Sequence, residues 1–201
     1  MKITFLAILT FIAFINCYCQ TVEEYFNSGS AKSDLQDYYG AISDYSKAIE
    51  IEPKAYGAYF NRGIAKLKLQ DYYGAISDFS KEIEHNQKDK ESYYNRGNAK
   101  YNLANYSGAI SDFINAISID PNYEMAIYNR GVSKDKLKDY KGAIIDYSMA
   151  IKINPKKIEA YFNRGLAEIY LGQKESGCID FSKAGELGDV NAYEMIKKYC
   201  N

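Results

Sequence analysis

An asparagine preceded by an aromatic residue recurs at one position of a repeating pattern in this chain. The asparagine amide carries both a donor and an acceptor, so a column of five could hydrogen-bond to the backbone of an extended chain whatever its sequence. The neighbouring rings would add large, rigid apolar contact area. We therefore predict a peptide-binding surface formed by Asn27, Asn61, Asn95, Asn129, Asn163, Phe26, Phe60, Tyr94, Tyr128 and Phe162.

The same residues have a second interpretation that needs no ligand. Side chains that recur at helical spacing are usually packing residues. The asparagines would then bond neighbouring helices, and the aromatic rings would belong to the core. The exposure of Asn95, Asn129, Tyr94 and Tyr128 distinguishes the two interpretations.

Catalytic and metal chemistry find little support in the sequence. His85 is the only histidine, which excludes histidine-based triads and multi-histidine metal sites. No Gly-rich phosphate loop, Cys-x-x-Cys pair or nucleophile beside a base occurs. An enzyme would need an active site of Tyr, Asn and Asp alone, so we predict no catalytic residue, no metal site and no cofactor. Five aspartates recur once per unit, which is typical of a structural role: Asp44, Asp78, Asp112, Asp146 and Asp180.

Composition narrows the class of partner. The chain has 201 residues, of which 47% are hydrophobic, and this is ordinary for one soluble domain. Lys and Arg number 25 and Asp and Glu number 26, for a net charge of -1. Because the two signs are balanced within each repeat, no basic face forms of the kind that neutralises phosphates. A nucleic-acid partner is not expected.

Glycines show the period of the pattern most clearly. Gly29, Gly63, Gly97, Gly131 and Gly165 are each separated by 34 residues, which is the period of a helix-turn-helix repeat. Apolar and small residues recur at i, i+4 and i+7 in two successive stretches of each copy, which predicts an antiparallel helix pair. We predict repeats at residues 22–55, 56–89, 90–123, 124–157 and 158–191, followed by a capping helix at 192–201.

The pattern resembles the tetratricopeptide repeat, in its Asn-Arg-Gly subtype. The family's aromatic, Gly, Ala, aromatic and Pro positions are matched in the first copy by Tyr25, Gly29, Ala41, Tyr45 and Pro53. Lysine replaces the Tyr that follows the Gly in four copies, and Glu168 replaces it in the last. The resemblance implies an all-α fold for residues 20–201, an α-solenoid in which five helix pairs wind into a right-handed superhelix.

The resemblance also implies that the asparagine column faces the concave side of the superhelix. Around this asparagine the family's carboxylate clamp places lysine and arginine, which grip the acidic tails of heat-shock chaperones. Here those places hold Phe26, Ser30, Glu91 and Asn95. A chaperone-tail adaptor is therefore disfavoured.

Local signals mark where the second helix of each repeat begins. Asp37, Asp71, Asn105 and Asp139 precede it as N-caps, each able to accept a backbone N–H that the helix start leaves unpaired. Small residues at the Gly and Ala phases allow the two helices of a pair to approach closely. The prolines fall at one phase between repeats, where a missing N–H costs nothing: Pro53, Pro121 and Pro155.

The N-terminus predicts export. Lys2 is followed by a mostly apolar run from Ile3 to Ile15, which is too short to span a bilayer but fits a signal peptide. Cys17 and Cys19 suit cleavage after residue 19, so we predict a signal peptide at residues 1–19 and a periplasmic or secreted protein. A lipoprotein acylated at Cys17 or Cys19 is the alternative.

Two side-chain pairings are expected. Arginines of the Asn-Arg-Gly sequence follow the aspartate of the preceding repeat by 18 residues, as Arg62 follows Asp44, which predicts a ladder of ion pairs between repeats closed by Asp180 and Lys198. Export would leave only Cys178 and Cys200, which predicts a disulfide in an oxidising compartment. Two buried free thiols are the alternative.

Two classes of function remain. One is a non-enzymatic scaffold of the cell envelope that binds an extended protein or peptide segment in its groove. The other is a structural or self-associating repeat unit, possible as a homo-oligomer, with no dedicated peptide ligand. Neither requires a cofactor, and no stable membrane insertion is expected after signal cleavage.

Overall fold

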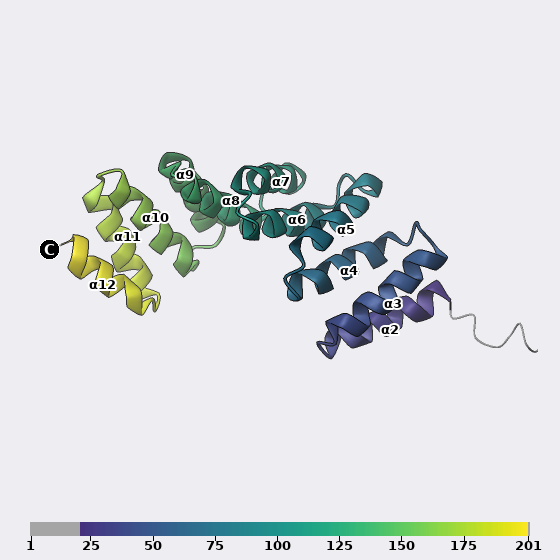
Figure 1. Cartoon of the computed structure of the whole chain (residues 1–201). Coiled ribbons are helices and arrows are strands. Elements are labelled where there is room, and N and C mark those ends of the chain that lie inside the picture. Colours follow the sequence, from purple (N-terminus) through teal and green to yellow (C-terminus); the bar gives the residue numbers. More distant parts are fainter. Residues whose placement is uncertain (1–20, 201) are drawn as a thin grey trace, which may run out of the picture. The chain divides into compact units, whose positions relative to one another are not determined.

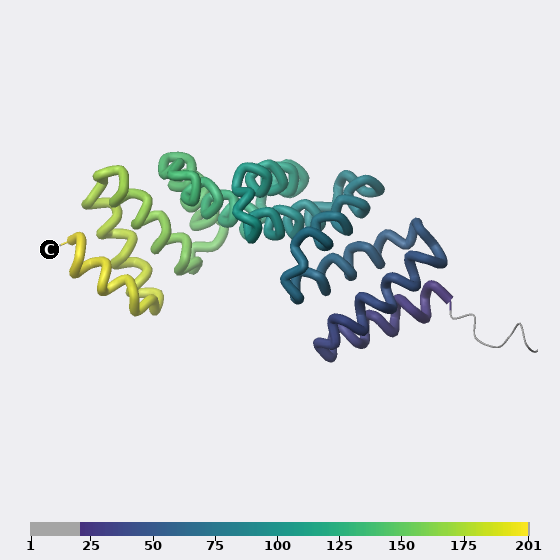
Figure 2. The backbone as a smooth tube through the Cα atoms, viewed as in Figure 1, coloured from purple at the N-terminus to yellow at the C-terminus, as the bar shows by residue number. Residues whose placement is uncertain are grey.

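A computed structural model describes residues 21–200 of the chain. These residues form helices separated by short turns, and no strand occurs among them (Figures 1 and 2). The all-α prediction is confirmed. The helices are α2 (Val22–Asp34), α3 (Tyr38–Ile51), α4 (Tyr56–Lys68), α5 (Tyr72–His85), α6 (Lys90–Asn102), α7 (Tyr106–Ile119), α8 (Glu124–Lys136), α9 (Tyr140–Ile153), α10 (Ile158–Tyr170), α11 (Lys174–Glu186) and α12 (Val190–Tyr199).

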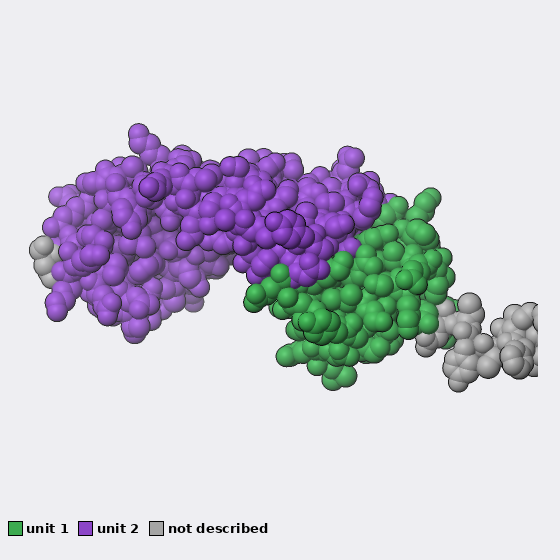
Figure 3. Space-filling model, viewed as in Figure 1, with its two compact units in different colours: residues 1–70 green, residues 71–201 purple. Residues whose placement is uncertain are grey.

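The described residues form two compact units, one ending at Gln70 and the other beginning at Asp71 (Figure 3). In the first, α3 packs against both α2 and α4. In the second, each helix from α5 to α12 packs against the next along the chain. We call the first helix of each predicted repeat its A helix (α2, α4, α6, α8, α10) and the second its B helix (α3, α5, α7, α9, α11). The A helices α6, α8 and α10 also touch in succession.

The predicted caps start the B helices. Asp37 Oδ1 accepts from the backbone N–H of Gly40 at 2.9 Å, and the equivalent bond recurs at Asp71, Asn105 and Asp139. Each bond satisfies a donor that the first turn leaves without a helical partner. The fifth repeat differs, because Gln173 stands at this place and makes no side-chain cap.

The turn between the A and B helices has one backbone conformation throughout. The residue just before the cap has a positive φ in every repeat, although only the last of these five residues is a glycine. The turn thus has the same left-handed residue at the same place in each copy. The residues are Gln36, Gln70, Ala104, Lys138 and Gly172.

Within a pair, the A-helix glycine lies against an aromatic ring of the B helix. A Cβ built on Gly97 would lie 2.7 Å from Phe113, and one on Gly131 would lie 2.9 Å from Tyr147. Both rings are fully buried. The close approach expected from the small residues is therefore confirmed, and it determines the distance between the two helices.

The predicted ladder of ion pairs between repeats is wrong. Arg96 reaches Asp112 of its own repeat, 16 residues ahead, with Nε 3.0 Å from one carboxylate oxygen and Nη2 2.7 Å from the other. The same two-pronged pairing joins Arg130 to Asp146 and Arg164 to Asp180.

The two ends that were expected to begin and close the ladder have other partners. Asp44 accepts instead from Ser28 and Lys32, both at 2.6 Å. The Lys198 ammonium lies over the Tyr199 ring, 4.8 Å from its centroid.

Two of these arginines, Arg96 and Arg164, also contact the preceding repeat through a neutral group. Arg96 Nη1 donates to Ser80 Oγ at 3.0 Å, and Arg164 Nη1 donates to Ser148 Oγ at 2.9 Å. A lysine completes the site in two repeats: Lys100 contacts Asp112 at 2.7 Å, and Lys134 contacts Asp146 at 2.8 Å. The buried carboxylate is thus paired inside its own repeat.

Helix α12 closes the second unit. Met195, Ile196 and Tyr199 pack against the buried cluster of Phe181 and Ala184, as expected of a cap. None of the helices in the described part of the chain is both long and apolar enough to span a bilayer. The signal peptide predicted at residues 1–19 lies outside the described residues.

Replacing Gly97 with Ala tests the close approach of the helices. The added methyl group would press on the buried Phe113 ring, so we expect the free energy of unfolding to fall by about 1–3 kcal/mol. Chemical denaturation measures this. Gly57→Ala is the matched control, because its Cβ would meet only Phe26 at 3.6 Å and alanine favours the helix by about 0.5–1 kcal/mol. Equal losses in both variants would contradict the explanation.

Candidate functional site

A hollow of about 170 Å³ opens between the A helices α6 and α8. Its lining combines two amides, two phenol rings and one aliphatic side chain, so it offers donors, acceptors and apolar surface together. Such a mixture suits a peptide better than a purely apolar or purely charged ligand. The lining residues are Asn98, Tyr101, Tyr128, Asn129 and Val132.

Asn129 connects the two helices that form the hollow. Its Nδ2 donates to Tyr94 Oη at 3.2 Å and to Asn98 Oδ1 at 2.9 Å. Asn163 repeats half of this arrangement one repeat later, where its Nδ2 donates to Tyr128 Oη at 2.8 Å. In these two repeats the predicted asparagine and the predicted aromatic residue of the preceding repeat are therefore brought together.

The other asparagines of the column behave differently. Asn61 Nδ2 donates to Gly57 O and Asn95 Nδ2 donates to Glu91 O, each four residues back in its own helix at 2.9 Å. Asn129 and Asn163 each bond to a tyrosine that stands 35 residues earlier. The residue 35 positions before Asn61 is Phe26, which has no hydroxyl to accept a bond. Asn27, in the first repeat, is exposed. The asparagines of the column therefore differ in their partners, and Asn129, between α6 and α8, makes two side-chain bonds to the preceding repeat.

The predicted aromatic residues lie at the border between the core and the surface. All five are half-buried. Tyr94 packs its ring on buried Phe113 with centroids 5.9 Å apart, and Tyr128 packs on buried Tyr147 at 5.7 Å. Phe26 and Phe162 make the corresponding contacts in their repeats. These four rings thus pack on the core while remaining partly exposed.

Tyr128 remains protonated under ordinary conditions. Burial, with a smaller contribution from the Glu159 charge, raises the pKa of its phenol to about 12. Its hydroxyl therefore stays available as both donor and acceptor. Lys157 lies over the same ring, 4.8 Å from its centroid, and its ammonium is 3.4 Å from Glu124. One face of Tyr128 is thus already occupied by a cation.

Sequence reasoning missed three residues of the hollow: Asn98, Tyr101 and Val132. The signal that points to them is helical spacing. On α6, Asn98 and Tyr101 stand four and seven residues after Tyr94 and so share its face of the helix. On α8, Val132 stands four residues after Tyr128 and shares its face in the same way. The prediction considered the repeated column and not the variable positions beside it.

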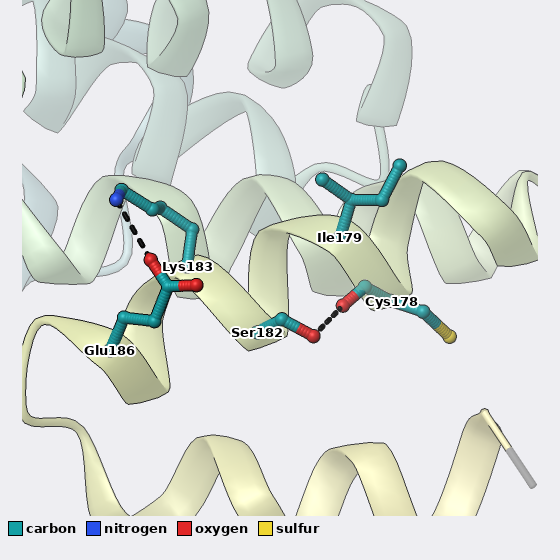
Figure 4. A pocket seen from close by; sticks show the side chains of 5 residues that line it. All are labelled: Cys178, Ile179, Ser182, Lys183 and Glu186. Carbon is teal, nitrogen blue, oxygen red and sulfur yellow. Dashed lines mark hydrogen bonds and ion pairs between the residues drawn. The ribbon is translucent and has the colours of Figure 1, made fainter.

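A second, shallow pocket of about 330 Å³ lies on α11 (Figure 4). All its lining residues come from this one helix, and its polar groups are already paired. Ser182 Oγ donates to Cys178 O at 2.9 Å, and Lys183 Nζ contacts Glu186 at 2.9 Å. Ile179 lines it as well. No set of groups converges there, and no cluster of three metal-ligating side chains occurs among the described residues.

The two cysteines expected to pair are bonded in the structure. Cys178 of α11 and Cys200, directly after α12, have their Cα atoms 5.8 Å apart and are joined through their sulfurs. The bond ties the B helix of the fifth repeat to the capping helix.

The fifth repeat also contains an unusual carboxylate. Glu168 stands where Lys100 and Lys134 contact their aspartates, so two acids, Glu168 and Asp180, share one arginine. Glu168 is only 9% exposed, and its Oε2 is without a hydrogen-bond partner. Burial, with the Asp180 charge adding to it and Arg164 opposing it, raises the pKa of Glu168 to about 7.

Glu168 should make stability depend on pH. The folded pKa is above the ordinary 4.5, so between these values the folded state holds a proton that the unfolded state has lost. The free energy of unfolding should therefore fall as pH rises through this window. We expect Glu168→Gln to remove this part of the slope in denaturation curves, and Glu168→Lys to raise the melting temperature at pH 8. Equal slopes in the wild type and the Gln variant would contradict this.

Removing the disulfide should destabilise the C-terminal end. The bond closes a loop across 22 residues, so its loss should lower the free energy of unfolding by about 3 kcal/mol in the chain-entropy model. Thermal melting with and without reductant measures this, and the double variant Cys178→Ser, Cys200→Ser should not respond to reductant. Thiol labelling of Cys178 and Cys200 in the unreduced protein would show that the bond is absent.

Family models match three segments of the chain. Residues 23–54 and 91–123 match the tetratricopeptide repeat, and residues 136–168 match the TPR repeat. A comparison with curated proteins finds no match.

Solved structures give the fold independently. MamA is similar at 27% identity over 85% of this chain and 97% of that chain, with a TM-score of 0.77. A MamA fragment from Desulfovibrio magneticus RS-1 matches at 19% identity over 83% and 94%, with 0.79. YrrB, described as "a TPR protein with an unusual peptide-binding site", matches at 20% identity over 87% and 91%, with 0.78. This chain therefore contains tetratricopeptide repeats, and its paired helices have the α-solenoid fold of proteins built from them.

Proposed function

We propose that this protein is a non-enzymatic scaffold that binds an extended protein or peptide segment on its A-helix face, at the hollow between α6 and α8. The observation that supports this most strongly is the hydrogen-bonded pair of side-chain amides of Asn98 and Asn129. Asn129 donates both of its N–H groups, to Tyr94 and Asn98, which leaves its own Oδ1 as an acceptor. Asn98 accepts that bond with Oδ1 and keeps its Nδ2 as a donor.

One acceptor and one donor side by side match a peptide unit. The N–H of a bound chain would donate to Asn129 Oδ1, and its C=O would accept from Asn98 Nδ2, without regard to the side chains of the ligand. Because each amide is held by the other, little side-chain freedom is lost on binding. Tyr101 and Val132 supply the apolar contact beside this pair.

Similar proteins support a role in binding. YrrB has the same fold and is described as having a peptide-binding site. Its likeness to this chain extends to the fold, so the position of the ligand proposed here rests on the α6 and α8 residues alone.

We further propose that the protein is exported and acts in the cell envelope, in the periplasm or outside the cell. The apolar run after Lys2 supports a signal peptide, with lipidation at Cys17 or Cys19 as the alternative. The bond between Cys178 and Cys200 supports an oxidising compartment, because disulfides persist there.

Self-association without a peptide ligand is the second candidate. The observation that favours it is an apolar strip on the outer face of α9, where Ile145 is 60% exposed, Met149 37% and Ile153 39%. Light scattering coupled to size exclusion separates the two candidates. A monomer whose mass does not change with concentration favours the peptide-binding scaffold.

The amide pair can be tested with arrayed short peptides that are acetylated and amidated. Replacing both Asn98 and Asn129 with Ala should weaken binding at least about tenfold, since two hydrogen bonds of about 1 kcal/mol each are lost. Asn115→Ala, on the B helix α7, is the control and should bind as the wild type does. Equal binding by all three proteins would show that peptides bind elsewhere. Failure of the wild type to bind any peptide would contradict the proposed function.

A further inference from the structure

Asp135 stands about one turn beyond Val132 on α8, the helix that carries three of the residues lining the hollow. Tyr128, Val132 and Asp135 stand at i, i+4 and i+7, so they occupy one face of the helix. Asp135 is half-buried, and its Oδ1 is buried with no hydrogen-bond partner. A carboxylate oxygen in this condition has lost its water without gaining a donor, which costs stability.

No other repeat places an acid here. The equivalent positions carry Ser33, Leu67, Tyr101 and Ile169, which are neutral. The carboxylate is therefore particular to the fourth repeat, one of the two that form the hollow, and the fold does not require it. Burial raises the pKa of Asp135, and after burial its charge is the largest influence that raises the pKa of the buried Tyr147 phenol. Both effects indicate a negative charge short of stabilising partners.

The nearby cations are committed elsewhere. Lys134 contacts Asp146, and Lys157 contacts Glu124 while lying over Tyr128. Lys136 is exposed and lowers the pKa of Asp135 less than burial raises it. In the part of the chain described, Asp135 forms no ion pair. The Asp135 carboxylate is thus without a cationic partner among these residues.

We propose that the hollow and Asp135 together form a subsite for a lysine or arginine side chain of the bound segment. This inference rests on the proposed function, because the amides of Asn98 and Asn129 hold the backbone of the same segment. The aliphatic stem would lie along Val132 and Tyr101, and its charged end would donate to the Asp135 carboxylate.

The surroundings favour an organic cation over a metal ion. The described residues offer no group of three metal-ligating side chains, and the hollow beside this turn of α8 is lined by phenol rings, amides and a valine. Tyr101 can accept a cation on its ring face. Tyr128 is the poorer platform, since Lys157 already lies over its ring. A long basic side chain meets both the apolar approach and the charged end.

The experiment uses three peptides that are identical except at one central position, which carries lysine, norleucine or glutamate. Norleucine keeps the stem and lacks the charge. Binding is followed by NMR through the side-chain amide signals of Asn98 and Asn129. We expect the lysine peptide to bind about tenfold more tightly than the norleucine peptide, and the glutamate peptide to bind most weakly.

Asp135→Asn should abolish the preference for lysine while leaving the affinity for the norleucine peptide unchanged. The control is Glu175→Gln, which removes the same charge from an exposed site on α11 and should keep the preference. Carbon-13 titration of the wild type provides an independent readout: the pKa of Asp135 should fall when the lysine peptide is bound and should not change with norleucine.

The outcomes separate the two proposals. Equal affinity of the lysine and norleucine peptides for the wild type overturns the basic subsite and leaves peptide binding intact, whereas absence of binding by all three overturns both. Thermal melting of Asp135→Asn checks for a structural role. We expect its melting temperature to equal or exceed that of the wild type, and a fall of several degrees would reveal an internal partner and overturn the subsite.

Discussion

The contact between an A-helix glycine and a B-helix ring sets how closely the two helices of a pair approach in the first, third, fourth and fifth repeats. At Gly97 there is no space for a single methyl group before Phe113 is reached. Tyr94, three residues before this glycine on α6, packs against the same ring, with centroids 5.9 Å apart. The asparagine and tyrosine side chains of α6 and α8 that border the hollow lie on the A-helix face, away from this contact. The candidate site is therefore a consequence of how the pair is packed.

Periodicity made the fold predictable to a large degree. A signal that recurs five times is far stronger than one helix pattern, and the caps at Asp37, Asp71, Asn105 and Asp139 stand where the sequence places them. The candidate site is less predictable for the opposite reason. It depends on what differs between repeats: a hydroxyl at Tyr94 that accepts from Asn129, where Phe26 offers none to Asn61. Repeated positions reveal the architecture, and variable ones give each part of it separate chemistry.

The ion-pair ladder shows where a periodic sequence misleads. Arginine and aspartate recur with the same period, so a spacing of 18 residues to the preceding repeat and one of 16 within the repeat are equally regular. Side-chain geometry decides between them. The planar guanidinium of Arg130 fits both oxygens of Asp146 across the facing helix, where the carboxylate is fully buried. A pairing of this kind can be recognised only once the crossing of the two helices is known.

The internal pairing of each arginine with its aspartate bears on how such a chain can change in length over evolution. In each of the third to fifth repeats, the buried aspartate pairs with an arginine of the same repeat. The bonds that Arg96 and Arg164 make to the preceding B helix go to serines, which carry no charge. Duplicating or deleting one whole unit would therefore leave no buried carboxylate stranded. Gene segments of this length can thus be copied or lost at little energetic risk, and a lineage can lengthen or shorten its binding surface one unit at a time.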